Sequence, residues 1–427
     1  MARKEIEKGK WDKILSQMDV PKLITYERNL VKIPSYLGEE EAKADYVAKE
    51  LERIGAEVYE MPLPTEDPPR RRSVIGILRG DGTGRTLLTG AHLDTHAKKE
   101  GQLHAHDGVI EDGKIYGVGT GDSHPGLAAI MEAMDTIKRS GVQLKGDVIF
   151  VADADELGHK YGARLVLDSG VKADMCIWCD ASEDPINMYV CNTGKVEVEI
   201  RVKGAYDFIL SAFAERKAMK AVNAVVCMHK IMDYLFQMQK EEPYFHNKHP
   251  LLPGEGAAFY FGPIIGGSVG YGDPTRKAGV GPGPFGLAVP MPTWCRLRVG
   301  ARYWPGETAE EFVAVVNKWV DKAKADYPSA EIEVECYLDD GNVPWEISPD
   351  AEVVDVLGRC IKYVHGKEPK CAGFIASGDQ VFYSQAPMES IWYGCNMRVG
   401  RADEYVTVKE LSDLCKVYVT AIMEVCT

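Results

Sequence analysis

Short apolar runs alternate with amphipathic stretches along the first half of the chain. Runs typical of buried strands lie near residues 73–78, 86–91, 147–152 and 174–179. Between the last three, apolar residues recur at helical spacing near 125–139 and 160–168, and two further helices are predicted between 21 and 55. This alternation predicts an α/β fold, a mostly parallel, doubly wound sheet with helices on both faces.

The pattern changes near Lys195. Apolar residues at 196, 198, 200 and 202 alternate with polar ones, as in a half-exposed antiparallel strand. A helix near 208–238, a Gly/Pro-rich arm at 243–292, a strand at 295–303, a helix at 307–324 and a strand at 330–337 follow. We therefore expect an inserted α+β domain over 194–340 between two parts of one catalytic domain, 1–193 and 341–427.

The second part of the catalytic domain is expected to resume the α/β pattern. Its predicted elements are helices near 350–364 and 407–424 and a strand near 390–393.

Composition and charge narrow the classes of partner. The 427 residues carry a formal charge of −14, which disfavours a broad surface for nucleic acid or anionic membrane. No signal-peptide pattern and no run approaching about 20 apolar residues is present, so a cytoplasmic protein is expected. The 11 cysteines favour free thiols over a disulfide framework. Cys176 and Cys179 have redox or zinc spacing, but an apolar strand around them favours buried thiols.

Candidate chemical groups follow the predicted strands. His92 and Asp94 end one strand, Asp153 to Glu156 follow the next, and Asp180 follows a third, while Asp122 lies on a glycine-rich loop before a helix. In such sheets ligands collect where the strands end. Asp94 is placed either to orient the His92 ring or against a neighbouring loop, and the sequence does not separate the two.

Carboxylates gathered at one sheet edge repel each other unless a cation lies among them. Mixed nitrogen and oxygen donors suit Zn²⁺, Mn²⁺ or Co²⁺. Each acid taken singly is better explained as a helix cap or a solvated group. Because they recur at four strand ends, a divalent metal becomes the favoured explanation.

These motifs resemble the metallopeptidase family that includes acetylornithine deacetylase, succinyl-diaminopimelate desuccinylase, aminoacylase and carboxypeptidase G. The resemblance rests on H-x-D-T at His92 and Asp94, Asp122 after a glycine loop, Asp155-Glu156, Asp180 and the P-G-E-T turn at 305–308. It implies a two-metal hydrolase, with His92 and Asp180 on one ion, Asp122 bridging, Glu156 on the other ion, and the residue before Glu156 as general base.

Several positions depart from that family pattern. The family's last metal-binding histidine corresponds to Gly400, the base position holds Asp155 instead of glutamate, and His124 replaces a lysine after the bridging acid. We therefore expect one Mn²⁺ or Zn²⁺ per subunit, held by His92, Asp122 and Asp180, with His96 and His124 as less favoured ligands. Glu156 then either binds this ion or acts as base, and Asp94, Asp155 and Glu156 are the expected catalytic acids.

Three functions remain open. Metal-dependent hydrolysis of a C–N bond is expected, and a resemblance to aminohydrolases of aromatic amines such as 5-nitroanthranilate implies release of ammonia. An acyl-amino-acid or dipeptide hydrolase and an inactive ligand-binding or partner-binding relative are the alternatives. Arg398 and Arg401 are candidates for binding an anionic small molecule, with surface ion pairs to Asp403 or Glu404 equally expected. The resemblance implies that the inserted domain, 194–340, serves as a lid and mediates dimers, so we expect a homo-oligomer.

Overall fold

The computed structural model describes residues 5–64, 70–205, 222–254, 258–267, 292–337, 340–394, 396, 398 and 404–427. The chain divides into two compact units. One comprises Met1–Cys191 together with Trp345–Thr427, and the other is Asn192–Pro344. The lid and dimerisation role expected for residues 194–340 stays a prediction.

The first unit is built on an eight-stranded sheet, ordered β1-β2-β6-β3-β7-β14-β8-β13. Its strands are β1 (Glu57–Pro62), β2 (Arg72–Leu78), β3 (Leu87–His92), β6 (Val148–Asp153), β7 (Met175–Trp178), β8 (Asn187–Asn192), β13 (Lys370–Phe374) and β14 (Glu389–Trp392). The central strands β6, β3, β7 and β14 are parallel. Strands β1, β2 and β8 pair antiparallel towards the edges. The expected parallel sheet is therefore confirmed at the centre and is mixed at its flanks.

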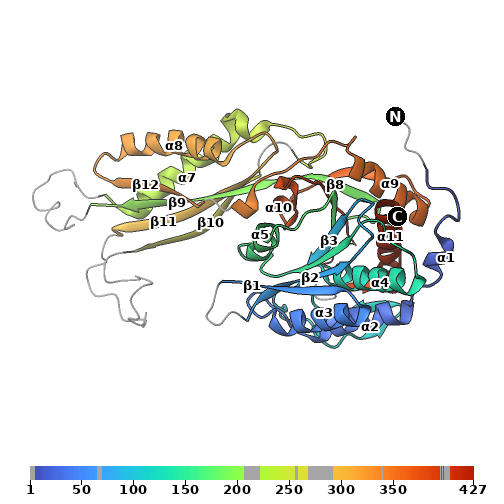
Figure 1. Ribbon diagram of the computed structural model, residues 1–427. Coiled ribbons are helices and arrows are strands. Elements are labelled where there is room, and N and C mark those ends of the chain that lie inside the picture. The colour runs from blue at the N-terminus through green and yellow to red at the C-terminus, as the bar shows by residue number, and fades with distance from the viewer. Residues whose placement is uncertain are drawn as a thin grey trace, which may run out of the picture. The chain divides into compact units, whose positions relative to one another are not determined.

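Helices cover both faces of this sheet (Figure 1). On one face lie α3 (Glu41–Ile54), α4 (His124–Ser140), α9 (Glu352–His365) and α11 (Val408–Cys426), with α2 (Val20–Lys32) packed on α4. On the other lie α5 (Tyr161–Asp168) and α10 (Gln380–Gln385). The unit also contains α1 (Asp12–Leu15) and a small sheet of β4 (Ile110–Glu111), β5 (Lys114–Tyr116) and β15 (Tyr405–Thr407). The doubly wound α/β fold is thus confirmed.

Burial on both faces explains why the central strands read as continuous apolar runs. Every residue of β3 and of β6 is buried. Close packing also requires a glycine within β3, because a Cβ at Gly90 would lie 2.3 Å from the carbonyl oxygen of Val151 and 2.4 Å from the ring of Trp178. This tight packing fixes the strand that ends at His92.

The second unit has a four-stranded antiparallel sheet, ordered β10-β11-β9-β12. Its elements are β9 (Gly194–Lys203), α7 (Ala224–Glu241), the 3₁₀ helix η1 (Pro243–His246), β10 (Ala258–Gly267), β11 (Trp294–Tyr303), α8 (Ala309–Asp326), β12 (Glu331–Tyr337) and the 3₁₀ helix η2 (Asp340–Asn342). Helices α7 and α8 lie side by side on one face of this sheet (Figure 1). A capping box of Thr308 and Glu311 starts α8.

Two predicted elements differ in this unit. The arm predicted at 243–292 contains strand β10, which was missed because Gly262-Pro263 and Gly266-Gly267 resemble a loop in sequence. Its irregular register at Phe261 and Ile264 accommodates the Gly-Pro pair as a bulge. The helix predicted at 208–238 is described from Ala224 to Glu241, and residues 206–221 lie outside the described part. Residues 255–257 and 268–291 of the arm lie outside it too.

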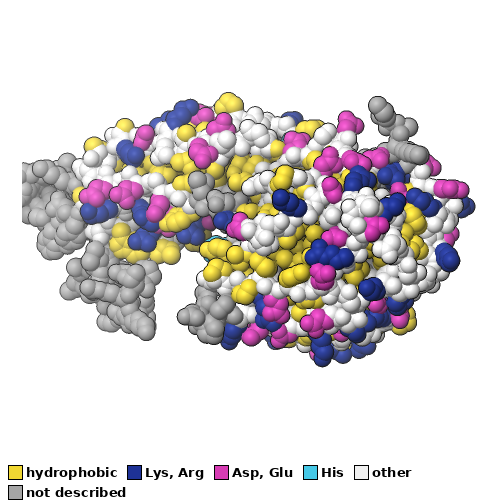
Figure 2. All heavy atoms as spheres, in the orientation of Figure 1, with side chains coloured by type: hydrophobic (Ala, Val, Ile, Leu, Met, Phe, Trp, Pro, Cys, Tyr) yellow, Lys and Arg dark blue, Asp and Glu magenta, His cyan; other side chains and the backbone are white. Residues whose placement is uncertain are grey.

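The surface and the thiols bear on two further expectations. On the face drawn in Figure 2, lysine and arginine side chains are interspersed with aspartate and glutamate side chains. The cysteines that the structure describes form no disulfide, and Cys176 and Cys179 are buried thiols whose pKa values burial raises to about 12. Within the described segments, no helix is both long and apolar enough to cross a membrane.

Candidate metal centre

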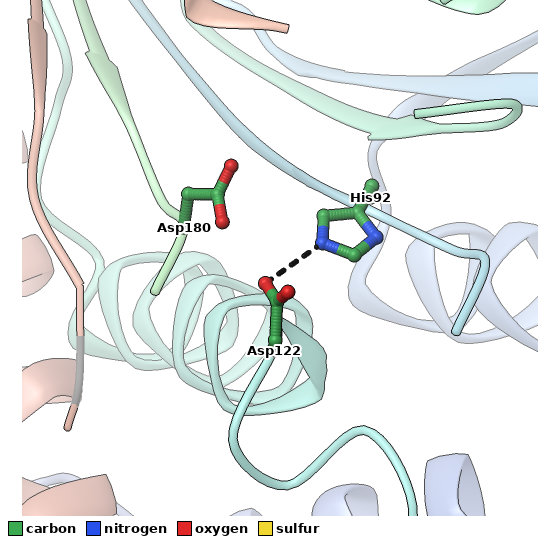
Figure 3. A group of neighbouring side chains, drawn as sticks. All are labelled: His92, Asp122 and Asp180. Atoms are coloured by element: carbon green, nitrogen blue, oxygen red, sulfur yellow. Dashed lines mark hydrogen bonds and ion pairs between the residues drawn. The ribbon is translucent and has the colours of Figure 1, made fainter. Parts of the chain in front are cut away.

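Three separate elements bring one imidazole and two carboxylates together (Figure 3). His92 is the last residue of β3, Asp180 follows the end of β7, and Asp122 lies on the loop before α4. Strands β3 and β7 are parallel neighbours, so their carboxyl ends lie at the same edge of the sheet. One ligand atom from each residue lies within 4.8 Å of the other two.

The charges of these three groups depend on one another. Burial favours neutral His92, but Asp122, whose Oδ1 lies 3.0 Å from His92 Nε2, outweighs it and raises the pKa of His92 well above 6.5. Burial and repulsion from Asp122 raise the pKa of Asp180 well above its usual 3.8. For Asp122, burial opposes ionisation, but His92 outweighs it and lowers the pKa. Two buried carboxyls that repel each other are the arrangement a divalent cation relieves.

The tautomer of His92 is set by the main chain. Its Nδ1 donates to the carbonyl oxygen of Asp94 at 2.8 Å, which leaves Nε2 facing Asp122. The backbone N–H of His92 donates to Ser123 Oγ at 3.2 Å, which ties β3 to the loop that carries Asp122. The ring is therefore oriented with Nε2 available as a metal ligand.

Asp94 meets both of the placements considered for it, since its Oδ1 lies 3.7 Å from His92 Nδ1 and its carboxylate also faces a neighbouring loop. Its carboxylate accepts the backbone N–H groups of Glu156 at 3.1 Å and Leu157 at 2.8 Å. The Asp94 carboxylate is fully buried. It therefore positions the loop that carries Glu156.

Asp155 and Glu156 face different partners. Asp155 Oδ1 accepts from the guanidinium of Arg71 at 2.6 Å. The ammonium of Lys160 lies 3.3 Å from Glu156 Oε1 and donates to the Glu156 carbonyl at 2.8 Å. Glu156 is close enough to affect the pKa values of His92 and Asp180, yet it is not one of the three donors grouped among the described residues.

Of the two arginines considered for substrate binding, the structure describes Arg398. The guanidinium of Arg398 donates to both carboxylate oxygens of Glu410, at 2.8 and 2.9 Å, and to the carbonyl of Tyr405. This partner differs from the Asp403 or Glu404 expected for a surface pair. Arg401 and Gly400 lie outside the described residues.

Sequence reasoning did not identify a buried cluster behind the Asp122 loop. Fully buried Lys43, on α3, contacts His124 Nε2, and His124 does not belong to the ligand group found among the described residues. Glu404 accepts the backbone N–H groups of Gly119 at 2.9 Å and Gly121 at 3.1 Å, which fixes the loop before Asp122. Acidic Asp403-Glu404 was a signal in the sequence, whereas Lys43 is in an ordinary amphipathic helix and gave none.

The donor set fits a divalent transition metal. One imidazole nitrogen and two carboxylate oxygens match the ligands of Zn²⁺ and Mn²⁺, whose bonds to such atoms are about 2.0–2.2 Å. His92, Asp122 and Asp180 would hold the ion. The hydrogen bond from His92 Nδ1 to the carbonyl of Asp94 keeps the imidazole in the orientation that metal binding needs. Fold and site together are those of a metallohydrolase.

Comparison with known proteins identifies the class. Residues 88–424 match the model of peptidase family M20/M25/M40. The chain belongs to this family, and it is a metal-dependent hydrolase acting on C–N bonds.

Individual relatives agree with this assignment. Acetylornithine deacetylase from Proteus mirabilis is 25% identical over 354 residues, covering 80% of this chain and 82% of that protein. N-formyl-4-amino-5-aminomethyl-2-methylpyrimidine deformylase from Halalkalibacterium halodurans is 28% identical over 181 residues, and the match spans 40% of this chain and 42% of that protein. The crystal structure of aminopeptidase PepT from Bacillus cereus superimposes with a TM-score of 0.74 at 17% identity, covering 96% of this chain and 99% of that chain.

Proposed function

We propose that this protein hydrolyses a C–N bond of a small molecule with water activated at a divalent ion held by His92, Asp122 and Asp180. The observation that carries the proposal is the convergence of these three donors at the carboxyl end of the parallel strands. A bound divalent ion lowers the pKa of a coordinated water to about 7. A buried carboxylate beside the ion then accepts a proton from the attacking water and passes it to the leaving nitrogen.

We propose one ion per subunit, either Mn²⁺ or Zn²⁺. The described residues provide one group of three donors, and the residue in place of the family's last histidine ligand is Gly400, which has no side-chain donor. Metal content measured on protein saturated with Mn²⁺ or Zn²⁺ tests this stoichiometry. Two tightly bound ions per chain would contradict it.

For the substrate we propose an aromatic amine such as 5-nitroanthranilate, with 5-nitrosalicylate and ammonia as products. In this reaction water adds to the ring carbon that bears nitrogen, and the C–N bond breaks as the nitrogen takes a proton and leaves as ammonia. The resemblance noted in the sequence supports this proposal. Arg401 is the remaining candidate for an anionic ring substituent.

An amide substrate is the second candidate. The names of two relatives, a deacetylase and a deformylase, support it. In that reaction the same water attacks an acyl carbon, and an amine leaves. The two candidates share the metal site and differ in the organic product.

One assay separates them. Protein loaded with Mn²⁺ or Zn²⁺ is incubated with a panel of amino-arenes, acyl amino acids and dipeptides, and ammonia, free amino acid and aryl product are followed. Ammonia without amino acid supports the aromatic amine, and release of amino acid supports the amide. Absence of turnover with every metal and substrate would contradict both and favour an inactive binding relative.

We also propose that the protein is a cytoplasmic homo-oligomer, a dimer or larger. Thiols without disulfides in the described part are typical of a reducing compartment. Light scattering tests the assembly, and a monomer at micromolar concentration would contradict it.

A further inference from the structure

A largely buried arginine, Arg71, holds the loop that carries the acidic pair 155–156. Arg71, just before β2, makes two hydrogen bonds of 2.7 Å to the carboxylate of Glu40, which precedes α3. The same guanidinium donates to Asp155 Oδ1 at 2.6 Å. Glu40 is fully buried, and 13% of the Arg71 side chain is exposed. The Arg71 guanidinium thus anchors Asp155, and Glu40 holds this guanidinium in place.

The other oxygen of Asp155 is engaged by its own loop. Asp155 Oδ2 accepts the backbone N–H groups of His159 at 3.0 Å and Tyr161 at 3.3 Å. The residue adopts a left-handed conformation with φ of 73°. A side chain on Gly158 would lie 2.6 Å from Asp155 Oδ1, so the glycine leaves the room that this arrangement needs. The carboxylate of Asp155 therefore closes a turn and has both oxygens occupied.

Glu156 is in a different position. Its backbone N–H is held by Asp94, its side chain is buried, and it acts electrostatically on His92 and Asp180. The ammonium of Lys160 lies 3.3 Å from Glu156 Oε1, which is longer than the 2.6 Å contact between Arg71 and Asp155. Of the two neighbouring acids, Glu156 is the one whose main chain is held by Asp94, the residue that also orients the His92 ring.

From this geometry we infer that Arg71 and Asp155 form a structural clamp that positions Glu156, and that Glu156 accepts the proton from the attacking water. The inference rests on the proposed C–N hydrolysis. It departs from the family pattern, in which the residue at position 155 acts as base. The proton of water moves to the Glu156 carboxylate as the new C–O bond forms, and it moves on to the nitrogen as the C–N bond breaks. Arg71 and Asp155 act through the loop and touch neither water nor substrate.

Activity and its pH dependence test the division of roles. Asp155→Asn suits the left-handed conformation and removes the charge that Arg71 needs, while Arg71→Met removes the clamp from the other side. Each is expected to lower kcat by about 10- to 100-fold, because Glu156 is misplaced. In each variant kcat is still expected to decrease at low pH, which is the acidic limb of the pH profile. The kcat of the double variant is expected to be no lower than the kcat of the less active single variant. Glu156→Gln is expected to lose about 10²–10⁴-fold in kcat and, with Mn²⁺ kept saturating at every pH, to lose that limb as well.

The adjacent arginine provides a matched control. Arg72 pairs with Asp45 and Glu60 instead of the acidic loop, so Arg72→Met is expected to leave kcat unchanged. The inference would be overturned if Asp155→Asn lost the acidic limb while Arg71→Met kept both the limb and the kcat of the wild type. Independent, additive losses in the double variant would overturn it as well.

Backbone amide exchange tests the clamp without any turnover. In Arg71→Met and Asp155→Asn, the amides of residues 156–161 are expected to exchange at least 10-fold faster than in the wild type and in Arg72→Met. Unchanged protection in Arg71→Met would overturn the clamp whatever the enzyme acts on. A wild type without turnover, but with the expected exchange, would instead remove the proposed function and keep the clamp.

Discussion

Single side chains at the ends of β3 and β7 carry the chemistry, and their proton affinities compete with metal binding. The pKa of His92 is raised well above 6.5 by Asp122, against the effect of burial, and the pKa of Asp180 is raised by burial and by Asp122. Both groups must lose a proton before they bind a cation. We therefore expect the affinity for Mn²⁺ to increase as the pH rises through the neutral range.

Asp180→Asn should weaken Mn²⁺ binding by more than about 100-fold, since loss of outer partners of ligands alone costs about 10–100-fold. Titration calorimetry of the purified protein measures this. Asp174→Asn is the control, because Asp174 lies just before the other end of the same strand and its carboxylate accepts the exposed N–H of Thr86. Equal affinities of the Asp180 variant and the wild type would refute the assigned ligand.

Arg398 and Glu410 make a prediction about stability in acid. Burial opposes ionisation of Glu410, but hydrogen bonds from Arg398, Thr407 and Asn396 outweigh it and lower its pKa from 4.5 to about 2. A depressed carboxyl pKa stabilises the folded state above pH 4.5, and this contribution is lost as the pH falls towards 2. Between these limits the free energy of unfolding of the wild type should fall by up to about 3 kcal/mol more than that of Glu410→Gln. Urea unfolding at pH 7 and pH 3 compares them, and parallel profiles would contradict the assignment.

Among the elements, β3 positions the site most directly. Gly90→Ala should lower the free energy of unfolding by about 1–3 kcal/mol, because the methyl group would meet the backbone of β6 and the ring of Trp178. Since His92 is two residues further along this strand, catalytic activity should fall by about 100-fold. Thermal unfolding and kcat measure the two effects. An alanine variant with normal kcat would show that the strand tolerates a shift.

The sequence predicted the central elements well, for a physical reason. Strands buried on both faces and helices with one apolar face leave strong patterns, as at β3, β6, α4 and α11. The half-exposed edge strands β1 and β13 leave weak patterns, and they were missed. Strand β8, which is buried and lies next to the edge strand β13, was missed as well. Strand β10 was missed because its glycines and proline are typical of loops.

The candidate ligands could be predicted because a strand end fixes where its last residue lies. The ion-pair partner of each acid could not be predicted, since Arg71 and Asp155 are 84 positions apart and the sequence around each gives no signal for the other. The contact between Lys43 and His124, 81 positions apart, escaped prediction for the same reason. Long-range ion pairs depend on side-chain packing that local periodicity does not encode.

At the scale of the whole molecule, the chain leaves the first unit and returns to it at adjacent residues, so the second unit can be deleted by a short connection. Cys191 and Glu346 form an antiparallel bridge, so the two ends of the first unit are adjacent. Replacing residues 192–344 with a short Gly/Asn turn should leave the first unit folded and able to bind Mn²⁺. If the inserted unit mediates assembly as proposed, the shortened chain should be monomeric by light scattering while the full chain is not. A shortened chain that still associates would place the interface in the first unit.

The central claim is that one divalent ion lies among His92, Asp122 and Asp180. Anomalous diffraction from crystals grown with Mn²⁺ or Zn²⁺, recorded on both sides of the metal's absorption edge, tests it most directly. We predict an anomalous peak about 2.0–2.2 Å from His92 Nε2 and from one oxygen of each aspartate. A protein that turns over substrate under the same conditions and shows no peak at this position would contradict the claim.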